Sequence, residues 1–113
     1  MVSHRLRRLP LLVACLMLVA ISFIWAANAA DAPVTVVMKN FNFTPMSLSV
    51  SAGTTVTFKN EDEEPHTVTS VTGLFRSGAL DTNDTFKFKF DRPGTYKYTC
   101  SIHPRMVAEI VVK

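Results

Sequence analysis

Four side chains that bind soft metal ions lie in two separated segments of the sequence. Cys100, His103 and Met106 recur at every third position of a short segment between two strand-like runs, and His66 follows Pro65 on an earlier run. Two imidazoles, one thiolate and one thioether form a donor set that suits copper. The sequence therefore predicts one mononuclear copper site. Its predicted ligands are His66, Cys100, His103 and Met106.

Each of these residues also has a simpler explanation. An isolated histidine is more often a surface or hydrogen-bonded residue, an isolated methionine is more often part of the core, and a buried cysteine is commonly inert. Their joint occurrence at these spacings favours a metal site over separate coincidences. Zinc also binds cysteine and histidine but rarely a thioether, so Met106 favours copper over zinc.

Cysteine and histidine together also raise the alternative of an enzyme. In that interpretation Cys100 would be a nucleophile, with His103 or His66 as its base. Such a pair needs an orienting third group and a substrate pocket, and the sequence indicates neither. We therefore predict that the protein is not an enzyme.

The first 29 residues have the features of an export signal. Three arginines precede an almost entirely apolar run at 9–27, and an Ala-Asn-Ala sequence at 27–29 fits signal cleavage. We therefore predict a signal peptide at 1–29, one domain at 30–113, and a periplasmic location. The apolar run is close to the length of about 20 residues that spans a bilayer, so an uncleaved membrane anchor is the alternative.

Charge and cysteine content exclude some functions for the predicted domain and favour metal binding. The predicted signal peptide at 1–29, called the leader below, carries three of the 12 basic residues and none of the 9 acidic ones. The remaining domain therefore has equal numbers of basic and acidic residues and is formally neutral. A neutral domain lacks the cationic surface that nucleic-acid binding requires, and we expect no nucleic-acid partner. Cys100 is the one cysteine of the domain, so it can form no internal disulfide and a metal is its expected partner.

Short runs of alternating apolar and polar residues predict strands throughout the domain. In the clearest run, 85–90, three phenylalanines alternate with polar residues that include two lysines. Glycine and proline turns separate the runs, and no helical spacing of apolar residues follows residue 30. We predict an all-β fold, an antiparallel Greek-key β-sandwich of about eight strands. The acidic run 61–64 is predicted to be a solvated loop. The predicted strands are 34–38, 40–44, 47–50, 54–60, 66–71, 85–90, 95–100 and 107–112.

The Cys-x-x-His-x-x-Met loop resembles that of the cupredoxins, the small type 1 blue copper proteins. Within this family it is most similar to the amicyanin and plastocyanin type, and its short interval from His103 to Met106 resembles amicyanin in particular. The resemblance extends over residues 33–113 and includes the segments 42–45 and 93–96. It implies an eight-stranded sandwich with one copper at one end, and a soluble, exported carrier of single electrons.

In cupredoxins the histidine of this loop reaches the surface where partners dock. The resemblance therefore implies that His103 is the electron port, with a rim that includes Pro65, Ile102 and Pro104. It also implies a monomer whose partners are redox proteins, such as a dehydrogenase, a cytochrome c or an oxidase. We expect contact with a membrane only through an uncleaved leader. A periplasmic copper chaperone or storage protein is the alternative function.

Two residues depart from the family pattern. Thr67 follows the first histidine where an asparagine often ties the two ligand segments together, and threonine has no amide to make the same pair of hydrogen bonds. Arg105 introduces a cation where amicyanins tend to be apolar, which favours a partner with an acidic rim. The reduction potential and the partner typical of the family are therefore not assumed for this chain.

Overall fold

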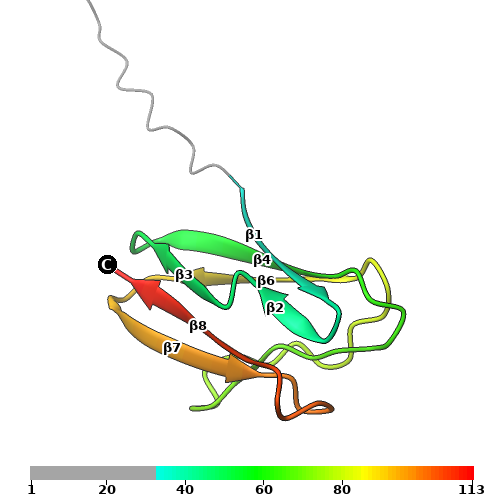
Figure 1. Ribbon diagram of the computed structural model, residues 1–113. Coiled ribbons are helices and arrows are strands. Elements are labelled where there is room, and N and C mark those ends of the chain that lie inside the picture. The colour runs from blue at the N-terminus through cyan, green and yellow to red at the C-terminus, as the bar shows by residue number, and fades with distance from the viewer. Residues whose placement is uncertain (1–32) are drawn as a thin grey trace, which may run out of the picture.

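Strands make up the regular secondary structure of residues 33–113, the part of the chain that the computed structural model describes (Figure 1). The predicted signal peptide at 1–29, its cleavage site and the alternative membrane anchor lie outside the described residues. Within residues 33–113 there is no helix, and therefore none that could cross a membrane. The prediction of an all-β fold is confirmed for this part of the chain.

Eight strands follow one another along the described residues, as the alternating pattern predicted. Most of them agree with the predicted ranges to within two residues at each end. They are β1 (Val34–Lys39), β2 (Asn42–Thr44), β3 (Ser47–Val50), β4 (Thr54–Asn60), β5 (Thr69–Ser70), β6 (Thr85–Phe90), β7 (Gly94–Thr99) and β8 (Val107–Val112).

The prediction of a strand over 66–71 is wrong in extent, because only Thr69 and Ser70 form β5. The backbone of His66 bonds to a loop segment instead of to a neighbouring strand. Its N–H donates to the carbonyl of Leu80 at 3.1 Å, and the N–H of Leu80 donates back at 2.7 Å. This isolated bridge fixes His66 in a loop just before the strand.

The strands form two four-stranded sheets, ordered β2-β1-β4-β6 and β3-β8-β7-β5. The predicted sandwich is confirmed, and two of its pairings, β1 with β4 and β3 with β8, are parallel rather than antiparallel. The chain changes sheet at every step from β2 to β7, so strands that follow one another in sequence are mostly not neighbours. Strands that are distant in sequence thereby become neighbours that run in the same direction.

Aromatic side chains from both sheets meet in the core. Phe43 of β2 and Phe58 of β4 pack edge-on against Tyr98 of β7, with ring centroids 4.7 and 5.3 Å apart. All three side chains are buried, and burial of a phenylalanine side chain is worth roughly 1.5–3 kcal/mol. The core therefore fixes the two sheets relative to each other, and with them the ends of the strands.

Four connections gather at one end of the sandwich, at the right of Figure 1: the β1–β2 turn, the loops β4–β5 and β7–β8, and the part of the β5–β6 loop around Leu80. Hydrogen bonds join them. The backbone N–H of Asn40 in the turn donates to Asp62 in the β4–β5 loop at 2.7 Å. The N–H of Thr67 donates to Sγ of Cys100 at 3.3 Å. This end of the sandwich therefore holds His66 beside the β7–β8 loop.

Asn60, at the end of β4, supports the β4–β5 loop from inside the protein. Its side chain is fully buried. The side-chain amide donates to the carbonyl oxygens of Glu64 and Leu80 at 2.9 and 2.8 Å, and the side-chain oxygen accepts the N–H of Asp62 at 2.9 Å. One buried side chain thus ties two of the loops that surround His66.

Candidate metal centre

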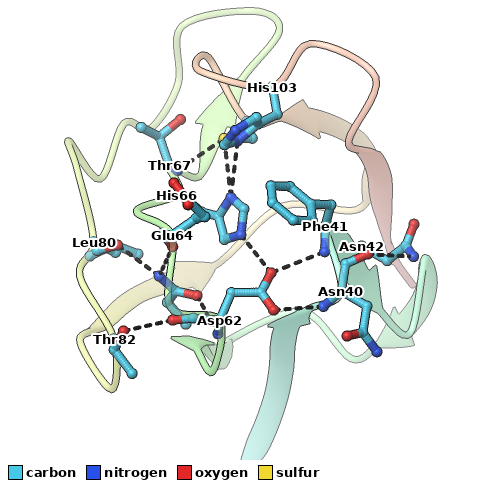
Figure 2. A network of polar contacts seen from close by, with 12 residues as sticks. Asn40, Phe41, Asn42, Asp62, Glu64, His66, Thr67, Leu80, Thr82 and His103 are labelled. Carbon is cyan, nitrogen blue, oxygen red and sulfur yellow. Dashed lines mark hydrogen bonds and ion pairs between the residues drawn. The ribbon is translucent and has the colours of Figure 1, made fainter.

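Three of the four predicted ligands converge on one point. The Nδ1 atoms of His66 and His103 lie 3.2 Å apart, and Sγ of Cys100 lies 3.9 and 3.6 Å from these two nitrogens. Figure 2 shows the two imidazoles directed toward the same place. His66 comes from the segment before β5, whereas the other two residues belong to the segment that joins β7 to β8. The fold therefore joins donor atoms that are 34 positions apart in the sequence.

The spacing of these three atoms fits a metal ion. Bonds of about 2.0–2.1 Å to nitrogen and 2.3 Å to sulfur, opened at 120° in one plane, separate the donor atoms by about 3.5–3.8 Å. The observed separations, from 3.2 to 3.9 Å, bracket this range. Two imidazoles and a thiolate in a trigonal arrangement are the donor set of blue copper sites. The residues present therefore fit copper.

Met106 lies in the same loop and is buried, with 4% of its surface exposed. Its N–H donates to the carbonyl of His103 at 2.9 Å, and its carbonyl accepts the N–H of Cys100 at 3.1 Å. These two bonds close the loop that carries three of the predicted ligands. The four residues are thus placed to form a copper site, and the role of the Met106 thioether as a ligand stays a prediction.

The site is buried on one side and open on the other. His66 and Cys100 are fully buried, whereas His103 is partly exposed. A surface hollow lies beside His103, and the predicted rim residues Ile102 and Pro104 line it, whereas the half-buried Pro65 does not. The other residues that line this hollow are Phe41, Asn42, Arg105 and Met106.

Comparison with known proteins agrees with this geometry. The family model of the Cupredoxin-like domain matches residues 11–112. The chain belongs to the cupredoxin-like family. The predicted family is thereby confirmed, and family and donor set together identify copper as the cofactor of this cupredoxin.

The relatives of this cupredoxin include several amicyanins. Amicyanin of Paracoccus denitrificans is 32% identical over 93 residues, which cover 78% of this chain and 71% of that protein. Amicyanin-alpha of Methylorubrum extorquens is 33% identical over 104 residues, which cover 83% and 82%. A solved structure of a reduced amicyanin variant aligns with a TM-score of 0.69 at 29% identity, covering 74% of this chain and 85% of that one. The predicted similarity to amicyanin is confirmed.

The thiol of Cys100 lies in surroundings that favour the thiolate. Burial raises the pKa of this group, but hydrogen bonds from the N–H of Thr67, from the ring of His103 and from the N–H of Ile102 act in the opposite direction. Together they lower the pKa of Cys100 to about 6. The thiolate is the form that binds metal, so this cupredoxin presents its sulfur ready for copper near neutral pH.

Thr67 ties the two ligand segments together despite the missing amide. Its hydroxyl oxygen accepts the backbone N–H of Ser101 at 2.7 Å and lies 2.9 Å from the Ser101 hydroxyl oxygen. The N–H of Thr67 donates to the sulfur of Cys100, as described above. Thr67 therefore links the two ligand segments through its hydroxyl and its backbone, although the family pattern often has an asparagine at this position.

Two residues at the site were missed by sequence reasoning. The prediction of a solvated loop at 61–64 is confirmed for its three glutamates, which are exposed. It is wrong for Asp62, because only 12% of this side chain is exposed. Its Oδ2 atom lies 2.7 Å from Nε2 of His66. Phe41 is the second missed residue, and its ring lies beside both imidazoles. The local sequence contained one signal for Asp62, a carboxylate four positions before the predicted ligand His66. Carboxylates are common in loops, so this signal was weak.

The surroundings of Asp62 favour its ionised form. Burial raises the pKa of this carboxyl group, but hydrogen bonds from the N–H of Phe41, from His66 and from the N–H of Asn40 together outweigh that effect. The pKa of Asp62 is therefore lowered from its ordinary value. A negative charge consequently lies directly behind His66 at neutral pH.

We predict that the Cys100 thiol of the metal-free protein ionises near pH 6, as measured by the ultraviolet absorbance of the thiolate. Because this pKa is lower in the folded protein than the value of about 8.5 in an unfolded chain, ionisation stabilises the fold. The stabilisation is absent below the folded pKa and grows as pH rises toward the unfolded pKa. Cys100→Ser, the control, lacks this rise. A thiol that ionises at its ordinary pKa would contradict the prediction.

We predict that Thr67→Val lowers the free energy of unfolding of the metal-free protein by about 1–2 kcal/mol, because the N–H of Ser101 loses its acceptor while the shape of the side chain is kept. Urea denaturation followed by circular dichroism measures the change. Thr67→Ser keeps the hydroxyl group and serves as the matched control. Equal stability of the two variants would show that the hydroxyl does not tie the segments.

Proposed function

We propose that this cupredoxin is an exported type 1 copper protein that carries single electrons between redox partners. The main support is the cluster of His66, Cys100 and His103, whose donor atoms all lie within 4.8 Å of one another. These three residues would hold the copper ion, with Met106 as a weaker fourth ligand. Copper held there supplies a one-electron couple between its cuprous and cupric states.

The contribution of the protein is to keep the donor atoms in one arrangement. Cys100 belongs to the hydrophobic core cluster, and His66 is fully buried between the loop segments that Asn60 and Leu80 hold. Close-packed interiors resist rearrangement, so these side chains move little when the charge of the site changes. Small rearrangement favours fast electron transfer in both directions.

The exposed side of the site supplies the contact with partners. We place partner docking at the hollow beside His103, where the ring is partly exposed. Phe41 and Ile102, each 48% exposed, give this surface an apolar character that suits close approach and exclusion of water. Arg105 lines the same hollow and favours a redox partner with acidic groups around its contact site. A dehydrogenase, a cytochrome c or an oxidase are the partner classes that we propose.

We propose that residues 1–29 direct export to the periplasm, that residues 30–113 form the functional domain, and that the protein acts as a monomer and not as an enzyme. The support is the sequence pattern of the leader, the single cysteine of the domain, and the similarity to amicyanins.

We expect the purified protein to bind one cupric ion per chain, to become intensely blue, and to exchange electrons reversibly in voltammetry. Visible absorption and voltammetry test this directly. Cys100→Ala, which lacks the thiolate, serves as the control and stays colourless. A wild-type protein that binds only cuprous ion without colour, and gives it up to a chelator, would instead support a copper chaperone or storage function.

We also predict that Met106→Leu keeps the metal but raises the reduction potential, because loss of a thioether donor destabilises the cupric state more than the cuprous state. Voltammetry of the variant measures the shift, and the retained blue colour shows that the other three ligands are intact. A potential equal to that of the wild type would mean that Met106 is not an axial ligand.

A further inference from the structure

Asp62 makes contacts that the other acidic residues of its loop lack. Its Oδ1 atom accepts the backbone N–H of Asn40 at 2.7 Å. Its Oδ2 atom accepts the N–H of Phe41 at 3.0 Å and lies 2.7 Å from Nε2 of His66. Figure 2 shows this carboxylate between the imidazole and the β1–β2 turn. One side chain therefore connects a metal ligand to a turn that contributes no ligand.

The contact between Asp62 and His66 determines which ring nitrogen is free to bind a metal. An ionised carboxylate only accepts hydrogen bonds, so Nε2 of His66 carries the hydrogen. In the neutral ring Nδ1 then has a free lone pair, and this atom faces Sγ of Cys100 and Nδ1 of His103. A partner on the second nitrogen generally fixes both the tautomer and the orientation of a metal-binding histidine.

The same carboxylate holds a turn that is unfavourable by itself. Asn40 and Phe41 have φ angles of 52° and 58°, in the left-handed region that a bulky side chain rarely occupies. Two-residue turns with positive φ at both positions usually have glycine at the second position. The two N–H groups bound by Asp62 belong to these two residues, so the carboxylate stabilises the turn in this conformation.

The turn places an aromatic ring against both imidazoles. The Phe41 ring is edge-on to the ring of His66, with centroids 5.4 Å apart and an interplanar angle of 86°, and to that of His103, at 5.0 Å and 85°. About half of the Phe41 surface, 48%, is exposed. The ring therefore separates part of the site from solvent and limits the motion of both imidazoles.

We propose that Asp62 is a positioning residue of the copper centre, which orients His66 toward the metal and holds the Phe41 ring against both imidazoles. This inference rests on the proposed copper function. A negative charge behind His66 favours the more positive, oxidised state of the site, so Asp62 lowers the reduction potential. The ring of Phe41 slows the access of small molecules to the metal.

Asp62→Asn tests the effect of the charge on the potential, because it keeps the shape of the side chain. Glu63→Gln removes an equal charge from an exposed neighbour in the same loop and is the matched control. We expect a higher reduction potential for Asp62→Asn, with the blue colour retained, and a potential close to that of the wild type for Glu63→Gln. Equal potentials in both variants would overturn the proposed role of Asp62.

The metal-free wild-type protein provides a second measurement that needs neither copper nor a variant. Nitrogen NMR of the histidine rings distinguishes the two tautomers, and we expect the hydrogen of neutral His66 on Nε2. A hydrogen on Nδ1, or exchange between both nitrogens, would overturn the positioning role. If the protein bound no copper, the proposed function would fail, whereas this measurement would still decide whether Asp62 orients His66.

Phe41→Gly separates the two parts of the inference. Glycine accepts the positive φ of this position, so Asp62 keeps its contacts while the ring is absent. We expect a chelator to remove copper faster from Phe41→Gly than from the wild type, with a smaller change in potential than in Asp62→Asn. An unchanged rate of copper removal would overturn the covering role of Phe41.

Discussion

The copper site depends on one junction between two segments that are distant in the sequence. The N–H of Thr67 donates to Sγ of Cys100, and the N–H of Ser101 donates to the hydroxyl oxygen of Thr67. These bonds hold the segment of His66 against the β7–β8 loop and direct an N–H dipole at the sulfur. Without them Cys100 would lose the largest of the contacts that lower its pKa, and burial, which favours the neutral thiol that binds metal poorly, would be less opposed.

Two polar contacts act on opposite sides of the proposed centre. The N–H of Thr67 withdraws electron density from the sulfur of Cys100, which favours the reduced state. The carboxylate of Asp62 adds negative charge behind His66, which favours the oxidised state. In the proposed electron carrier the potential reflects the balance of these contacts as well as the ligands themselves. Both contacts come from residues that touch a ligand and are not ligands.

The strands, and the closeness of the two proposed ligands Cys100 and His103, could be predicted from the sequence for local reasons. The alternation in β6 and β7 marks which side chains face the core, as burial of Phe90 and Tyr98 confirms. Cys100 and His103 lie close together in the sequence, so their convergence requires only a short loop. The parallel pairing of β1 with β4 was not predictable in this way, because it depends on where the chain crosses between the sheets.

By itself, the sequence determined the donor types, the spacing of the loop ligands and the two-layered β architecture, because these follow from composition and short-range periodicity. Only the tertiary structure decided which side chain of the acidic run turns inward. Asp62 does so because its partners Asn40 and Phe41, 22 and 21 positions earlier, reach the same end of the sandwich as His66. No local sequence pattern predicts this contact, because it depends on how the two sheets pack. The packing brings loops that are distant in the sequence to the same end of the sandwich.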